Sequence, residues 1–229
     1  MEEEINRIKE VYSERAISSK IDYNPALPAN NYFIISKEKL LAKLLYKFIG
    51  TDFSNVKILD VGFGNGSDLL TLIKYGFSIK NIYGVEVLHE RFEKVKEILP
   101  AANLTLINGF SLPYTDNSMD LIIQSTVFSS ILDLNSRKQL ATEMYRVLKT
   151  GGKIFSYDMR ISNPWNKNVI KIDKNEIKQL FPAAEASFYT LTLNPVIARR
   201  IANYSIVLCE IFDKIPTLCS HYYTVIQKN

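Results

Sequence analysis

The feature that most constrains the fold is a regular alternation of short apolar segments with amphipathic ones from Val56 onward. Short apolar runs are typical of buried strands, and apolar residues three or four positions apart are typical of helices. Strands that alternate with helices favour a mostly parallel sheet with helices on both faces. The predicted strands are 56–61, 81–87, 104–107, 119–125, 153–158, 187–193 and 222–226. The predicted helices between them are 67–75, 90–99, 137–149 and 173–181.

Further helices are predicted before the sheet and inside its last connection. Residues 2–19 predict a charged helix, and a stronger helix begins near Ser36 and ends by Gly50. We treat residues 1–33 as an N-terminal extension that either closes over a site as a lid or only covers the sheet. Residues 194–216 predict a helical insert over the active site, before the last strand. The length of 229 residues fits a single domain.

Composition narrows the functions that this chain can have. Hydrophobic residues make up 47% and charged residues 23%, which argues against global disorder. The net charge of +4 is too small to favour nucleic acid as a partner. The acidic first residues do not resemble a secretory signal, and no apolar run is long enough to cross a bilayer, so we expect a cytoplasmic protein without a membrane span. Two cysteines and two histidines predict neither a disulfide framework nor a metal site.

The loop Asp60–Gly66 follows the first strand, opens a helix and holds three of the nine glycines. Glycine allows a sharp turn and a close approach of the backbone to a ligand. The spacing is G-x-G-x-G, not the G-x-G-x-x-G of dinucleotide folds, and the acid at position 60 suits a ligand that carries an ammonium group. Glu86 closes the second strand, where a carboxylate can accept hydrogen bonds from two ribose hydroxyls. Asn108 and Gly109 end the third strand, where they can read an adenine edge.

Together these segments resemble the class I S-adenosylmethionine (SAM)-dependent methyltransferases over about residues 34–161. The glycine motif of that family is similar to residues 58–66, its adenine loop to 108–113, and its Arg-Val-Leu-Lys-x-Gly-Gly turn to 146–152. The resemblance implies a Rossmann-like α/β fold of seven strands, in which the last strand is antiparallel and lies beside the fifth. It implies SAM as the cofactor and S-adenosylhomocysteine as its product. The implied cofactor-binding residues are Asp60, Gly62, Phe63, Gly64, Asn65, Gly66, Glu86, Val87, Asn108, Gly109, Phe110, Gln124 and Ser125.

Two positions depart from the family pattern. Asn108 stands where the family often has Asp, and its amide oxygen can still accept from the adenine amino group, so we expect weakened but not lost recognition. Ser129 and Ser130 stand where the family often has two histidines, which removes one source of a catalytic base. Residues 127–131, 157–160 and 163–164 are similar to a subgroup of small bacterial methyltransferases from surface-glycan and secondary-metabolite pathways.

The catalytic candidates are Asp158, which ends the fifth strand, and His221, which begins the last. A hydroxyl acceptor usually needs a base close enough to take its proton. In the topology that the resemblance implies, these two residues are neighbours at the sheet edge that faces the methyl group, and the carboxylate orients the imidazole. The alternatives are a solvated turn carboxylate for Asp158 and a histidine bonded to backbone for His221.

Four residues are candidates for binding the acceptor. Tyr12 and Arg15 lie in the N-terminal extension, and they contact the acceptor if this extension is a lid. Tyr23 lies in the same extension. Arg160 follows the fifth strand. Arg199 lies on the insert, where it either binds a phosphate or carboxylate of the acceptor or faces solvent.

The predicted function is methyl transfer from SAM to a small molecule, preferably at oxygen. A sugar or nucleotide-linked intermediate of a bacterial surface polysaccharide or secondary metabolite is the expected acceptor. N-methylation, hydride transfer with NAD and a SAM-binding partner subunit without catalysis are the alternatives. The glycine spacing and Asp60 count against NAD, and activity on any acceptor would exclude the non-catalytic subunit. The sequence does not predict an oligomeric state.

Overall fold

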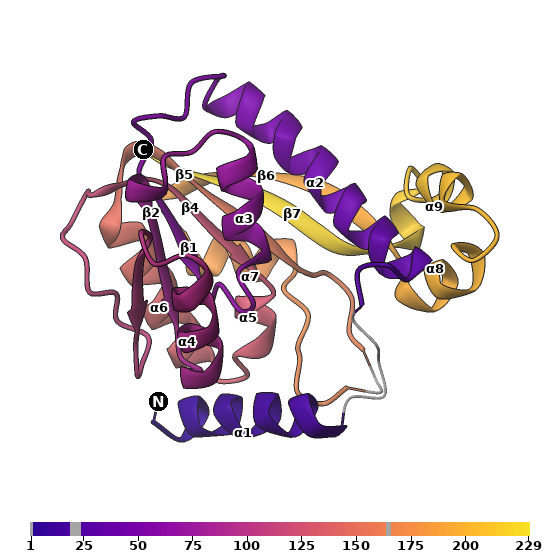
Figure 1. Ribbon diagram of the computed structural model, residues 1–229, viewed down its shortest axis with the longest axis horizontal. Coiled ribbons are helices and arrows are strands. Elements are labelled where there is room, and N and C mark those ends of the chain that lie inside the picture. The colour runs from indigo at the N-terminus through magenta and orange to yellow at the C-terminus, as the bar shows by residue number, and fades with distance from the viewer. Residues whose placement is uncertain (1, 19–23, 164–165) are drawn as a thin grey trace.

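The computed structural model describes residues 2–18, 24–163 and 166–229, and a seven-stranded sheet forms its centre (Figure 1). The strand order is β3-β2-β1-β4-β5-β7-β6. Strands β1 to β5 pair in parallel, whereas β7 runs antiparallel to both β5 and β6. The implied topology is therefore confirmed, including the antiparallel last strand beside the fifth. The strands are β1 (Ile58–Val61), β2 (Ile82–Glu86), β3 (Asn103–Leu106), β4 (Met119–Ser125), β5 (Leu148–Met159), β6 (Ala184–Leu193) and β7 (Cys219–Lys228).

Helices cover both faces of the sheet because the side chains of successive strand residues point to opposite faces. Ile58 and Phe155 pack into one apolar cluster with α2, α3 and α4, and Leu59 and Ile154 pack into a second with α5, α6 and α7. The helices of the first face are α2 (Pro28–Phe48), α3 (Ser67–Lys74) and α4 (His89–Ile98). Those of the second face are α5 (Val127–Ser130), α6 (Leu134–Val147) and α7 (Lys174–Leu180). Two 3₁₀ turns, η1 (Ile79–Asn81) and η2 (Pro216–Leu218), complete the connections.

The N-terminal helix α1 (Glu2–Ser18) runs along one end of the molecule (Figure 1). It buries Ile5 and Ile8 in the second apolar cluster. Glu4 fixes its first turn by accepting a hydrogen bond of 2.6 Å from the backbone N–H of Leu132. Helix α1 is thus anchored to the loop between α5 and α6, although the two segments are far apart in the sequence.

Helix α2 starts at Pro28, not near Ser36 as predicted. Proline is favoured in the first turn of a helix because its missing N–H would have no partner there. Ser36 is instead a buried residue inside the helix, and its hydroxyl lies 2.8 Å from a carboxylate oxygen of Asp213. The short helix α5 was not predicted.

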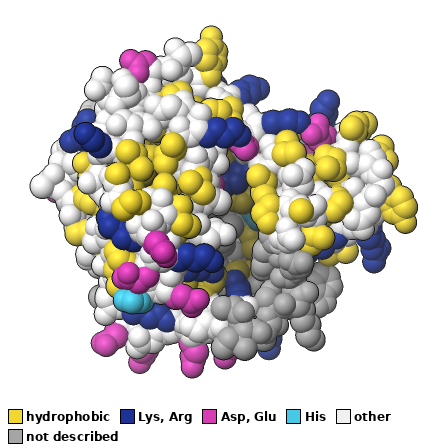
Figure 2. Space-filling model, viewed as in Figure 1, with side chains coloured by type: hydrophobic (Ala, Val, Ile, Leu, Met, Phe, Trp, Pro, Cys, Tyr) yellow, Lys and Arg dark blue, Asp and Glu magenta, His cyan; other side chains and the backbone are white. Residues whose placement is uncertain are grey.

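Residues 194–216 form two short helices, α8 (Pro195–Ile201) and α9 (Ile206–Phe212), where one was predicted. Both pack against α2 and β6, at the side of the molecule away from α1 (Figure 1). The space-filling view shows hydrophobic side chains on the exposed surface of this insert (Figure 2). None of its residues lines the large cavity described below, so the structure does not place the insert in the wall of that cavity.

Tyr32 of α2 links this helix to the end of β6. Its side chain is fully buried, and the backbone N–H of Leu193 donates to its hydroxyl at 3.0 Å. Burial raises the pKa of this phenol well above its usual range, so it stays neutral.

Replacing Tyr32 by Phe would leave the Leu193 N–H buried without its partner. We expect Tyr32→Phe to lower the free energy of unfolding by about 1–3 kcal/mol, measured by urea denaturation. The matched control is Tyr46→Phe, on the exposed side of the same helix, where 72% of the residue is accessible, and it should change stability by less than about 0.5 kcal/mol. Equal stability of the two variants would contradict the proposed anchoring.

Candidate cofactor and active site

A cavity of about 1140 Å³ opens at the carboxyl ends of strands β1 to β4. Parallel α/β sheets commonly bind ligands at this edge. Helix α1 forms the opposite wall, so it lines the cavity and does not only cover the sheet. Tyr23, named with this extension, lies outside the described residues. The residues of α1 that line the cavity are Ile5, Ile8, Lys9, Tyr12, Ser13 and Arg15.

The glycine loop turns sharply between β1 and α3. Gly62, Gly64 and Gly66 have φ angles of 68°, 56° and 80°, in the left-handed region that favours glycine. A Cβ on Gly62 would lie 2.7 Å from Cγ2 of Val127, so this position has no room for a side chain. Gly62 to Asn65 line the cavity as predicted, but Gly66 does not, because it packs against α4. Gly66 therefore lies outside the cavity wall, and its cofactor contact stays a prediction.

Asp60 ends its strand as a buried carboxyl that faces the cavity. Its Oδ2 atom has no hydrogen-bond partner among the residues that the structure describes. Burial raises the pKa of Asp60 well above its usual value, and the nearby charges of Asp68 and Glu86 raise it further. A buried carboxyl that lacks a partner fits a ligand that brings an ammonium group.

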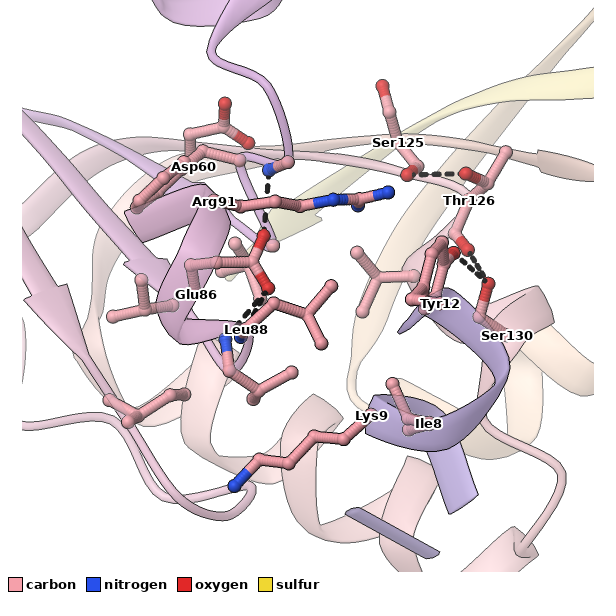
Figure 3. A pocket seen from close by; sticks show the side chains of 18 of the residues that line it. Ile8, Lys9, Tyr12, Asp60, Glu86, Leu88, Arg91, Ser125, Thr126 and Ser130 are labelled. Atoms are coloured by element: carbon pink, nitrogen blue, oxygen red, sulfur yellow. Dashed lines mark hydrogen bonds between the residues drawn. The ribbon is translucent and has the colours of Figure 1, made fainter. Parts of the chain in front are cut away.

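Glu86 ends β2 with its carboxylate held in one orientation. It accepts hydrogen bonds from the backbone N–H groups of Gly64 at 2.8 Å, Val87 at 2.8 Å and Leu88 at 3.1 Å (Figure 3). A carboxylate has about four acceptor sites, so one remains for a ligand, and the bond to Leu88 is the longest of the three. This arrangement joins the glycine loop to the end of β2 and fits a ribose.

Asn108, Gly109 and Phe110 line the cavity beyond β3, as predicted for the adenine loop. A Cβ on Gly109 would have open space around it. The Nζ atom of Lys9 donates to Oδ1 of Asn108 at 2.8 Å, which the sequence analysis did not foresee. The oxygen keeps a second lone pair for an adenine amino group. No sequence pattern links these two residues, because they come from segments 99 positions apart.

Lys37, Asp68 and Ser125 form a second polar cluster. The sequence analysis named Ser125 but neither Lys37 nor Asp68. The Nζ atom of Lys37 lies 2.6 Å from Oδ2 of Asp68 and 2.5 Å from Oγ of Ser125. Burial alone would raise the pKa of Asp68, but the charge of Lys37 and the hydrogen bonds outweigh it and lower the pKa. Asp68 is therefore ionised and paired at the wall beside β4.

Asp158 and Gln124 belong to a buried network and do not line the cavity. Asp158 accepts from the backbone N–H of Ser129 at 3.0 Å, from the hydroxyl of Ser156 at 2.9 Å and from the amide of Gln124. Burial raises the pKa of Asp158 to about 6 although these hydrogen bonds oppose it. Gln124 also accepts from the backbone N–H of Val127 at 2.8 Å. The predicted cofactor contact of Gln124 is therefore wrong, since its amide holds the turn after β4.

His221 lies on the opposite face of the sheet from Asp158. In the β5–β7 register His221 pairs with Met159, while Asp158 pairs with Tyr222. The imidazole stacks on the ring of Tyr157, with centroids 4.6 Å apart, and its Nδ1 lies 2.8 Å from the hydroxyl of Ser220. Burial lowers the pKa of His221 to about 4. The predicted dyad is wrong because neighbouring positions of a strand point to opposite faces.

Two of the four residues predicted to bind the acceptor lie away from the cavity. Arg160 donates to the backbone carbonyl oxygens of Pro216 and Cys219, where it supports the start of β7. Arg199 is exposed on α8. Neither lines the cavity, whereas Tyr12 and Arg15 do.

Within residues 2–18, 24–163 and 166–229, no three His, Cys, Asp or Glu side chains gather in a way that could hold a metal ion. None of the described helices is long and apolar enough to span a membrane.

The sheet order, the glycine turn and the acids at the ends of β1 and β2 define a Rossmann-like enzyme that binds a nucleoside-type cofactor. Residues 59–156 match the family described as the methyltransferase domain. This segment is a methyltransferase domain of the class I SAM-dependent type, and SAM is the cofactor that this family uses.

Two relatives are similar over most of this chain. A "protein-lysine N-methyltransferase" of Saccharolobus islandicus is 26% identical over 155 residues, which cover 67% of this chain and 89% of that protein. The "uncharacterized 37.1 kDa protein in transposon TN4556" of Streptomyces fradiae is 26% identical over 211 residues. That match covers 82% of this chain but only 60% of the length of the Streptomyces protein.

A solved structure extends the likeness of the fold to nearly the whole chain. Geranyl diphosphate C-methyltransferase from Streptomyces coelicolor, in complex with Mg²⁺, geranyl diphosphate and S-adenosylhomocysteine, superposes with a TM-score of 0.65 at 13% identity. The superposition covers 97% of this chain and 96% of that one. At this identity the comparison supports the fold and not the acceptor.

The raised pKa of Asp60 makes cofactor binding dependent on pH. A neutral Asp60 must lose its proton to pair with an ammonium group, so SAM affinity should rise as pH increases above the usual titration range of an aspartate, with release of a proton on binding. Asp60→Asn should weaken binding by about 1.5–3 kcal/mol and flatten this dependence, as measured by calorimetry in two buffers. Asp52→Asn, an exposed carboxylate outside the cavity, is the control. A wild-type pH profile in the Asp60 variant would show that the ammonium lies elsewhere.

The lowered pKa of His221 should make stability depend on pH. Below about pH 6.5 the unfolded chain binds a proton on this imidazole that the folded chain does not bind until about pH 4. His221 therefore contributes stability that is present above about pH 6.5 and lost as pH falls to about 4, by at most about 3 kcal/mol. The raised pKa of Asp158 changes stability with pH in the opposite direction, but it does so equally in the wild-type protein and in a variant at His221.

His221→Phe keeps an aromatic ring on Tyr157 and removes the titration. Relative to this variant, the wild-type protein should lose stability as the pH falls from about 6.5 to about 4. Thermal unfolding at each pH measures this loss. Parallel pH profiles for the two proteins would mean that the imidazole titrates alike in both states.

Proposed function

We propose that this chain transfers the methyl group of SAM to an oxygen atom of a small molecule held between α1 and the turn after β4. The observation that carries this proposal is the closure of the cavity by α1. The hydroxyl of Tyr12 lies 3.1 Å from that of Ser130, and Arg7 donates to the backbone oxygen of Ser130 at 2.6 Å. A cavity roofed in this way admits a small acceptor more readily than a folded protein or a nucleic acid.

The cofactor subsites follow from the chemistry of the wall. In this proposal Asp60 binds the ammonium group, Glu86 binds the ribose through its remaining acceptor site, and Asn108 with Gly109 binds the adenine edge. SAM supplies the electrophilic methyl group when it is bound. The remaining residues proposed to contact the cofactor are Gly62, Phe63, Gly64, Asn65, Val87, Phe110 and Ser125.

The proposed acceptor side is lined by hydroxyl groups, and the predicted pair of His221 and Asp158 does not line the cavity. Thr126 and Ser130 face Tyr12 across this part of the cavity (Figure 3). The carboxylate of Asp68 is paired with Lys37, which makes it a weak base. We therefore propose that alignment of the acceptor and exclusion of water by α1 supply most of the rate enhancement.

A screen of hydroxyl compounds, including nucleotide-linked sugars, tests this proposal through release of S-adenosylhomocysteine. Glu86→Ala should weaken SAM binding by about 1–3 kcal/mol, because it removes the partner of a buried hydrogen-bonded group. His221→Phe should keep its turnover within about threefold, whereas loss of a general base would cost about 10²–10⁴. Unchanged SAM affinity after Glu86→Ala would refute the ribose assignment.

Two other activities would be recognised in the same assay. Methylation of lysine side chains in added protein would favour the N-methyltransferase alternative, which the name of the Saccharolobus relative raises. SAM binding with no turnover on any acceptor would favour a partner subunit without catalysis.

A further inference from the structure

The rim of the cavity carries cationic side chains that have no ion-pair partner among the described residues. Arg15 of α1, Arg91 of α4 and Lys94 of α4 all line the cavity. Within the part of the chain that the structure describes, these three make no hydrogen bond and no ion pair. The other cavity lysines are already used, since Lys37 pairs with Asp68 and Lys9 bonds to Asn108.

Both arginines contact the ring of Tyr12. The guanidinium carbon of Arg91 lies 4.5 Å from the ring centroid, and that of Arg15 lies 5.1 Å from it. Arg91 extends across the cavity toward Tyr12, from the wall that also carries Glu86 (Figure 3). Stacking on an aromatic ring orients a guanidinium plane and leaves its N–H edge free for hydrogen bonds to an anion.

The charges of the cavity do not balance without an anionic ligand. In the proposed complex the carboxylate of Asp60 is paired with the ammonium group of the cofactor, and Glu86 already accepts three backbone hydrogen bonds. Glu90 adds one carboxylate to the exposed rim, against the three unpaired cations. The cofactor brings an ammonium and a sulfonium against a single carboxylate, so a neutral acceptor would leave like charges facing one another.

We propose that Arg15 and Arg91 bind a phosphate or diphosphate group of the methyl acceptor, with Tyr12 holding the two guanidinium groups in place. This inference rests on the proposed function and narrows its substrate to a phosphorylated small molecule. Arginine forks match the oxygen spacing of phosphate, and two of them within reach of one ring suit a group with several anionic oxygens. Arg199, the residue that the sequence suggested for this role, lies outside the cavity.

Inorganic pyrophosphate is the probe, titrated by calorimetry into protein saturated with S-adenosylhomocysteine. We expect binding at a 1:1 ratio, weakened about 10- to 100-fold by Arg15→Gln and by Arg91→Gln. The affinity for S-adenosylhomocysteine, measured separately, should change less than about threefold in both variants, which also shows that they fold. Arg199→Gln is the matched control and should leave both affinities unchanged.

The possible outcomes separate this inference from the proposed function. Failure of S-adenosylhomocysteine to bind wild-type protein would refute the cofactor assignment itself. Normal cofactor binding without pyrophosphate binding would overturn only the phosphate inference. Competition between pyrophosphate and S-adenosylhomocysteine would place the arginines in the cofactor site. So would a loss of cofactor affinity in the arginine variants, and either result would overturn the phosphate inference. Equal binding of malonate, a dicarboxylate, would overturn the preference for phosphate.

Discussion

The turn between β1 and α3 is the constraint on which the site depends. Gly62 must adopt a left-handed conformation with Val127 against its α-carbon, where any side chain would clash. The same turn brings the backbone N–H of Gly64 to the carboxylate of Glu86, so that the ends of β1 and β2 are held together. Asp60 is left buried at the base of the turn with an oxygen that has no partner among the described residues. A ligand that binds there satisfies a group that the fold itself leaves unsatisfied.

Carboxyl groups at this sheet edge differ in charge because their surroundings differ. Asp68 is ionised because Lys37 and Ser125 compensate for its burial, while burial keeps the pKa of Asp60 high. Asp158 is buried too, but it supports the turn after β4 from inside the protein. Three buried or partly buried aspartates near this edge of the sheet therefore serve three purposes, and residue type alone does not distinguish them.

Helix α1 turns an open sheet edge into an enclosed cavity. Its apolar residues pack into the core, and Glu4 and Arg7 attach it to the loop after α5. Its polar face supplies Tyr12, which contacts side chains from two walls of the cavity. The variable part of the site is thus built from an element outside the common sheet, which is consistent with one fold serving many acceptors.

The sequence by itself determined the sheet and the cofactor side of the cavity. The sheet depends on a local pattern, the apolar periodicity of its strands and helices. The cofactor side of the cavity depends on the run from Asp60 to Gly64 and on Glu86 and Asn108 at strand ends. These patterns could be read because each residue acts within its own βα unit, and the parallel topology brings the strand ends together.

Only the tertiary structure decided the acceptor side. His221 and Asp158 are indeed on adjacent strands, but a register set by long-range packing places them on opposite faces, and a shift of one residue reverses the face. Arg91, Lys37 and Lys9 reach the cavity from three separate helices. Their positions follow from how α1, α2 and α4 pack on the core, and such contacts between distant segments leave no local pattern in one sequence.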